Sequence, residues 1–189
     1  MNNKKILFSL FALMVLAQLL APSQMIYTQE NILASGKLFK FKTQPVDPND
    51  PFRGKYISLS FDQNKIFVKN STNFHEGEMV FVKLNTDANG FAKITSISKT
   101  EPAENFDYLK LKINYLDYNN KNIIYLDLPF NQFFMNENKA QSAETVYQES
   151  NKIIQNNTCA LVAIKSGKAV LKDVLIDNIS VRKLANKKP

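Results

Sequence analysis

Between Gly36 and Ile176 the chain alternates apolar and polar side chains in short runs, and this period of two constrains the fold more than any other feature. Successive side chains of a β-strand point to opposite faces, so such runs predict strands with one buried face. Turn residues separate the runs at short intervals, which is typical of antiparallel sandwiches and barrels. We therefore expect a mainly β, antiparallel domain with a sandwich or barrel-like architecture.

Three pairs of runs have the spacing of β-hairpins. These pairs are Glu78–Leu84 with Phe91–Ile97, Tyr108–Tyr115 with Ile123–Leu128, and Cys159–Ile164 with Ala169–Ile176. Further strands are predicted at Lys37–Lys42 and Lys55–Phe61, the second with Ile57, Leu59 and Phe61 on one face.

One helix is predicted among these strands, from Asn136 to Ile154. This segment lacks Gly and Pro, and its apolar residues recur at roughly helical spacing. Residues 182–189 are rich in Lys and Arg, and we expect them to form a frayed basic tail.

The N-terminus has the charge-then-hydrophobe order of a targeting segment. Basic residues in Met1–Lys5 precede an apolar run, Ile6–Ala21, that only Ser9 and Gln18 interrupt. Two interpretations compete: a signal peptide cut near Ala21 or Ser23, or an uncleaved anchor that continues to Tyr27.

We favour the uncleaved anchor, because Pro22 makes the nearest cleavage position a poor one. At about 1.5 Å per residue, Ile6–Tyr27 is long enough to cross a bilayer, with Tyr27 as an interfacial aromatic. The predicted organisation is an anchor or signal segment at 1–27, a β-rich domain at 28–181 and the tail. Lys4 and Lys5 on the cytoplasmic side would place the C-terminal domain outside the cytoplasm.

Composition and single residues argue against several function classes. The net charge is +7, but six of those charges lie at the ends, so no basic face for nucleic acid stands out. These six are Lys4, Lys5, Arg182, Lys183, Lys187 and Lys188. His75 is the only histidine and Cys159 the only cysteine, so we expect no disulfide, metal site or cofactor, and we interpret Cys159 as a buried structural thiol.

The stretch from Gln44 to Phe61 reads QPVDPNDPFRGKYISLSF. It resembles the GDYXXLXY family of bacterial membrane-anchored proteins, whose pattern is a hydrophobic N-terminal segment, a PVDPRD-hydrophobic-RGDY stretch and a β-rich remainder. Lys55 stands where the family name has Asp, and Phe61 where it has the last Tyr. The resemblance implies a single-pass protein of the inner, cytoplasmic membrane, from a family with no established activity that often occurs beside multi-span membrane proteins.

The same stretch supplies our candidate docking residues. They are Pro45, Asp47, Pro48, Asp50, Arg53, Gly54, Tyr56, Leu59 and Phe61. Short acids accept backbone N–H groups in turns and a guanidinium can pair with a carboxylate, so Asp47, Asp50 and Arg53 predict a locally paired turn. A stiff turn that only sets the entry of the next strand is the simpler interpretation, and a docking surface is the functional one.

From these features we expect a non-enzymatic accessory subunit that contacts an integral membrane partner. The alternative is a periplasmic domain that binds a ligand or an envelope polymer through the aromatic run Phe130–Phe134. A faint likeness to the β-rich core of signal-peptidase-type serine enzymes remains. However, no serine sits in a pocket signature with a lysine that could act as its base.

Overall fold

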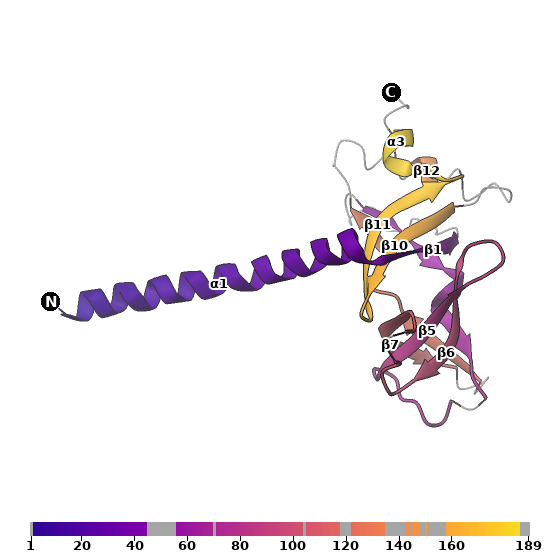
Figure 1. Ribbon diagram of the computed structural model, residues 1–189, viewed down its shortest axis with the longest axis horizontal. Coiled ribbons are helices and arrows are strands. Elements are labelled where there is room, and N and C mark those ends of the chain that lie inside the picture. The colour runs from indigo at the N-terminus through magenta and orange to yellow at the C-terminus, as the bar shows by residue number, and fades with distance from the viewer. Residues whose placement is uncertain are drawn as a thin grey trace.

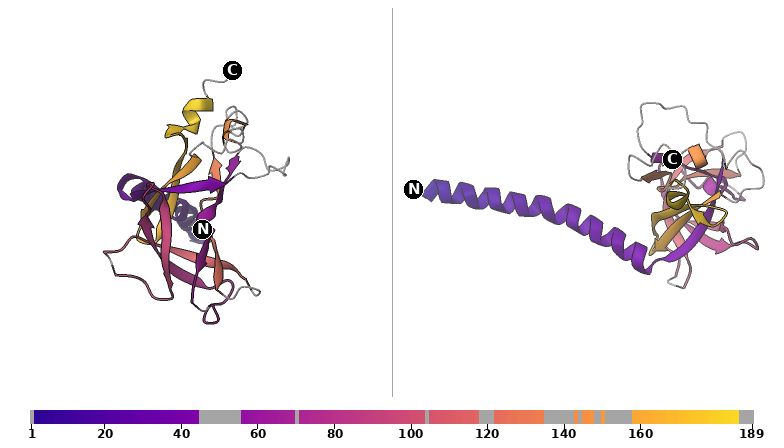
Figure 2. Two further views of the ribbon diagram at one scale, coloured as in Figure 1. Left: turned by 90° about the vertical axis from the view of Figure 1, so that its right-hand side faces the viewer. Right: turned by 90° about the horizontal axis from the view of Figure 1, so that it is seen from above.

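A computed structural model describes residues 2–44, 56–69, 71–103, 105–117, 122–134, 143, 145–147, 150 and 158–185 of the chain. It shows one long helix, α1 (Asn2–Ser35), that projects from a β-rich domain (Figure 1). The view from above shows most of α1 lying clear of the domain (Figure 2). The β domain is mainly antiparallel, as the alternating pattern predicts.

The first sheet has the strand order β12-β11-β10-β1-β3. Its strands are β12 (Ile179–Ser180), β11 (Lys168–Ile176), β10 (Thr158–Lys165), β1 (Lys37–Gln44) and β3 (Ser60–Phe61). Strand β1, which follows α1 directly, pairs with β10 from near the other end of the chain. Nearly every residue of β10 is buried, which fits a central strand covered on both faces.

The second sheet has the order β4-β8-β7-β5-β6. Its strands are β4 (Lys65–Phe67), β8 (Ile123–Asp127), β7 (Tyr108–Leu116), β5 (Met79–Thr86) and β6 (Ala92–Ser98). The edge strands β4 and β6 contact each other, so this sheet is nearly closed into a barrel. Register shifts between β5 and β6 and between β7 and β8 add the local bending that such curling needs.

Short elements connect the two sheets. The helical turn η1 (Asp62–Asn64) leads from β3 into β4, and β2 (Tyr56–Ser58) pairs with β9 (Gln132–Phe134). Isolated parallel bridges join Lys40 to Phe91 and Leu109 to Gly167. The sheets therefore form one body with a shared core.

Three aromatic rings lie in that core. The Phe41 ring centroid lies 4.9 Å from that of Phe130 and 6.1 Å from that of Phe61, and the Phe61 and Phe130 centroids lie 5.3 Å apart. Tilted and edge-on contacts at these distances are the favourable geometry for aromatic pairs. Because the rings come from β1, β3 and the loop before β9, the cluster ties distant parts of the chain together.

All three predicted hairpins are confirmed, as β5–β6, β7–β8 and β10–β11. The prediction of one strand over Lys55–Phe61 is wrong, because the chain changes partner at Leu59: β2 pairs with β9, whereas β3 pairs with β1. The predicted inward face is correct, since Ile57, Leu59 and Phe61 are all buried.

A helix and a basic tail were also predicted in the C-terminal part of the chain. Within the predicted helix at 136–154, the described residues 143, 145–147 and 150 are helical, and the helix ends lie outside the described residues. The predicted tail differs from the structure at its start, because residues 181–185 form the short helix α3 (Val181–Ala185). Val181 and Ala185 are buried, so the apolar side chains of this segment hold it on the domain, and residues 186–189 lie outside the described part.

The β5–β6 turn gives a first testable prediction. One Asp87 side-chain oxygen accepts the N–H groups of Asn89 (2.9 Å) and Phe91 (2.8 Å). We expect Asp87→Ala to lower the free energy of unfolding by about 1 kcal/mol, because both donors lose a partner. Asn89→Ala in the same turn should change it by less than about 0.5 kcal/mol. Urea unfolding of the two variants checks this, and equal losses would show that the Asp87 bonds contribute little.

Candidate functional site

The junction between α1 and β1 is formed without a linker. Gly36 separates the helix from the strand, and its N–H donates to the Ile32 carbonyl (2.8 Å). A Cβ at Gly36 would lie 2.5 Å from that carbonyl oxygen and 3.1 Å from the backbone N and O of Ile164. The end of α1 therefore lies directly against β10, and only glycine fits at position 36 without a shift of backbone atoms.

Side chains hold the last turns of α1 in place. The Lys165 ammonium, at the end of β10, donates to the Ser35 hydroxyl (2.7 Å) and to the Asn31 side-chain oxygen (3.3 Å). Ile32, between them on the helix, is only 5% exposed. These contacts attach the C-terminal end of α1 to the β domain.

The rest of α1 is apolar and uncovered. By length and composition, Lys4–Ser35 could cross a membrane: its most apolar window has a mean hydropathy of 2.1, and none of that window is buried. The Leu, Ile, Met, Phe and Tyr side chains from Ile6 to Tyr27 are all more than half exposed. In water such a surface would be unfavourable, whereas a bilayer would cover it.

A groove of about 640 Å³ lies between α1 and the β domain. Its helical wall runs from Ala21 to Ile32, and its other wall comes from β7 and β11. Two lysines, Lys110 and Lys168, line the groove, and no acidic residue does. Along α1, the groove extends from the end of the apolar run at Ala21 to the turn at Ile32 that packs on the domain.

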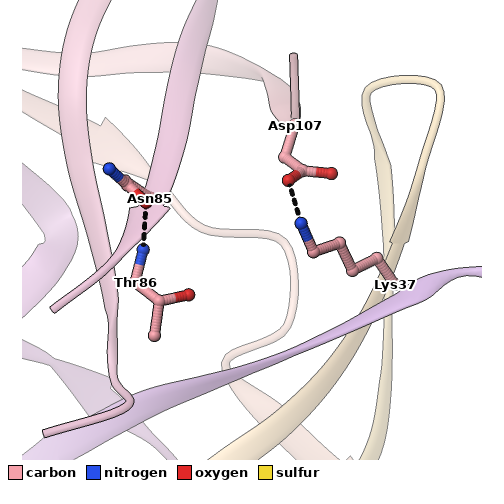
Figure 3. Close-up of polar contacts among 4 residues, drawn as sticks. All are labelled: Lys37, Asn85, Thr86 and Asp107. Carbon is pink, nitrogen blue, oxygen red and sulfur yellow. Dashed lines mark hydrogen bonds and ion pairs between the residues drawn. The ribbon is translucent and has the colours of Figure 1, made fainter. Parts of the chain in front are cut away.

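A second hollow, of about 760 Å³, lies beside the junction and is more polar. Lys37 at the start of β1 pairs with Asp107 at its edge (Figure 3). Their side chains are 63% and 36% exposed, and exposed ion pairs of this kind contribute about 0–1 kcal/mol. The junction therefore depends mainly on packing at Gly36 and Ile32, and less on this ion pair.

The structure divides the predicted docking residues into two groups. Pro45, Asp47, Pro48, Asp50, Arg53 and Gly54 lie outside the described residues. Tyr56 pairs with Phe134 between β2 and β9, while Leu59 and Phe61 are 4% and 3% exposed. The last two are core residues and cannot form a docking surface.

The aromatic run Phe130–Phe134 is mostly interior. Phe130 and Phe133 are 3% and 2% exposed, and only Phe134, at 65%, faces solvent. An exposed patch here would have favoured the ligand- or polymer-binding alternative, and two of the three rings instead fill the core, as is usual for such runs.

Cys159 is confirmed as a buried thiol. Burial raises its pKa above the usual value, and Lys40 nearby lowers it by less. Since the thiolate is the reactive form, we expect a thiol-alkylating reagent to label the native protein at least about 100-fold more slowly than the urea-unfolded chain. Mass spectrometry of timed samples measures both rates, and a native rate close to the unfolded one would contradict the burial.

Other chemistry of the described residues is sparse. No group of three or more His, Cys, Asp or Glu side chains in the part of the chain that the structure describes could hold a metal ion. Glu78 is an ordinary surface acid, whose pKa is lowered by its 2.7 Å ion pair with Lys99.

Fold and junction together define a class of protein: a β-rich domain joined without a linker to one exposed apolar helix. The family model described as "GDYXXLXY protein" matches residues 18–174, and the chain belongs to this family. The match starts inside α1 and includes Gly36, so the helix end and its junction are part of the family unit. No curated protein and no solved structure matches the chain.

The junction of α1 with β1 was not predicted, although the sequence contains a signal for it. The predicted anchor ends at Tyr27, whereas the helix continues to Ser35. Gly36 directly before an alternating run is a common helix stop, and the Gln29–Asn31 residues are compatible with helix. No local signal points to Lys165, because its partners on α1 lie more than a hundred residues away.

Proposed function

We propose that this protein is a single-pass accessory subunit of a membrane complex, with its β domain outside the cytoplasm and no enzymatic activity of its own. The observation that carries the proposal is the linker-free junction at Gly36. A domain that only needed tethering could hang on a flexible segment. A junction without a linker would fix the orientation of the domain to the bilayer, which favours contact with an integral membrane partner because less freedom is lost on binding.

The uncovered surface of α1 supports the same proposal. Within a bilayer, helices associate by packing, and an exposed apolar helix offers a surface for a multi-span partner. The domain would then meet the outer face of that partner, with the segment 45–55 as the proposed contact. Lys4 and Lys5 before the apolar run favour this orientation, with the inner membrane as the proposed location.

A pull-down of the tagged full-length protein from its native membranes in mild detergent tests the proposal, with an intact mass measured on the same sample. We expect an uncleaved chain and a stoichiometric multi-span partner. Recovery of a cleaved chain alone would overturn both the anchor and the accessory role.

Isosteric variants then test the proposed contact segment. We expect Asp50→Asn to lower partner recovery about tenfold, a loss typical of an important interface residue. Asp173→Asn removes the same charge on β11 and keeps the oxygen that accepts the Val174 N–H (2.9 Å), so it should recover the partner normally. Normal recovery with Asp50→Asn would place the contact elsewhere.

A further inference from the structure

The groove between α1 and the β domain has apolar, polar and cationic side chains in its lining. Ala21, Met25 and Ile32 are the apolar residues of its helical wall, where Gln24, Thr28 and Gln29 lie among them. Lys110 and Lys168 come from β7 and β11 on the other wall. Its volume of about 640 Å³ lies within the range of sites for small molecules. The ligand that it suits must have an apolar part and an anionic part.

The fold fixes the two lysines on the same side of the groove. The Lys110 N–H donates to the Gly167 carbonyl (2.9 Å), and Leu109 forms a parallel bridge with Gly167. Gly167 has a φ of +75°, and a Cβ there would lie 2.7 Å from the Tyr108 ring. Glycine at this turn allows β7 and the β10–β11 turn to approach closely, which brings Lys168 beside Lys110.

The position of the groove along α1 matches the boundary of a bilayer. If the apolar run enters at Ile6, the roughly 20 residues that span about 30 Å of hydrocarbon end near Met25. The end of the groove at Ala21 then lies among acyl chains, and the part near Ile32 lies outside the hydrocarbon. In that arrangement Lys110 and Lys168, which line the groove, would face the layer of lipid headgroups.

We propose that this groove binds one anionic phospholipid of the outer leaflet, with its phosphate between Lys110 and Lys168 and an acyl chain along the α1 wall. The inference rests on the anchored arrangement proposed above. No carboxylate lines the groove, and the Lys110 ammonium lies 5.6 Å from the centroid of the Phe81 ring, so neither lysine has an acidic partner in the groove. Lysine binds phosphate as a point charge, and cations close to an anionic membrane surface are attracted to it.

Charge also distinguishes this occupant from others. A second copy of the chain would bring the same two lysines to the site, where like charges repel. A purely apolar partner helix would cover both lysine charges without supplying an anion. A zwitterionic lipid carries a positive headgroup charge that the lysines disfavour.

Native mass spectrometry of the full-length protein tests the proposal, after delipidation in detergent and titration with phosphatidylglycerol or phosphatidylcholine. We expect one phosphatidylglycerol per chain, bound at least about tenfold more tightly than phosphatidylcholine. The double variant Lys110→Gln/Lys168→Gln should lose this difference. The matched variant Lys65→Gln/Lys93→Gln removes the same charge from β4 and β6, outside the groove, and should keep it.

Three outcomes would overturn the proposal: no preference for the anionic lipid, equal loss in both double variants, or equally tight binding of soluble glycerophosphate. The last would identify an anion site without a role for the acyl chain. The intact mass separates this failure from failure of the anchored arrangement. An uncleaved chain without lipid preference contradicts only the lipid site, whereas a chain cut near Ala21 contradicts the anchor itself.

Discussion

Replacement of Phe41 by alanine is expected to lower the free energy of unfolding by about 3–5 kcal/mol. Phe41 is fully buried, and its ring packs against those of Phe61 and Phe130. The truncation removes apolar burial and leaves a cavity that these rings can fill only in part. A loss of this size is a large share of the roughly 5–15 kcal/mol that stabilises a typical domain. Urea unfolding in detergent, followed by circular dichroism, measures it.

Phe67→Ala is the matched control. Phe67 lies on β4 and is 69% exposed, so the same change of side chain should cost less than about 0.5 kcal/mol. Losses of similar size for the two variants would contradict the core position of Phe41.

Local patterns in the sequence were sufficient to predict the strands and hairpins, because alternation and turn residues are signals that can be recognised within a few residues. The pairing of β1 with β10 in the first sheet is different. Strand β1 pairs with β10 in the register Lys37 to Ile164, across more than a hundred residues. Such pairing depends on which buried faces fit together in the folded core, and alternation leaves that choice open.

The strand at Lys55–Phe61 shows how a correct pattern can conceal a change of partner. Ile57, Leu59 and Phe61 all point inward, so the alternation continues without interruption. At Leu59, however, the N–H donates to the Asn131 carbonyl (2.8 Å), between the pairing with β9 and the pairing with β1. Burial sets the pattern of side chains, whereas the backbone partner can change within it.

The candidate site was less predictable than the fold. Aromatic side chains suit both cores and binding faces, and only the structure shows that Phe130 and Phe133 fill the core. The groove could not be predicted either, because Lys110 and Lys168 become neighbours only through the contact of β7 with Gly167. The apolar helix was predictable, since length and hydropathy alone identify it.

Replacement of Gly36 by alanine is the prediction that bears most directly on function. The new Cβ would approach the Ile32 carbonyl oxygen to 2.5 Å, and this is a backbone atom that no rotamer change can move. The last turn of α1 must therefore shift, and because the Ile164 backbone of β10 lies 3.1 Å from the same Cβ, the packing of α1 on β10 loosens. We expect a loss of about 3 kcal/mol, at the upper end of overpacking costs, and faster hydrogen exchange in a peptide covering residues 28–40. Partner recovery in the pull-down should fall with it, because the domain loses its fixed orientation.

Gly90→Ala separates this steric effect from the loss of glycine itself. Gly90 has a φ of +82°, and no atom lies within 4 Å of the place that a Cβ would take there. Its replacement should therefore cost about 1 kcal/mol and leave exchange at residues 28–40 unchanged. If Gly36→Ala behaves like Gly90→Ala in both measurements, the junction is not closely packed. If it loosens the junction and the partner is still recovered in full, a fixed orientation of the domain is not required, and the partner must hold the protein through α1 alone.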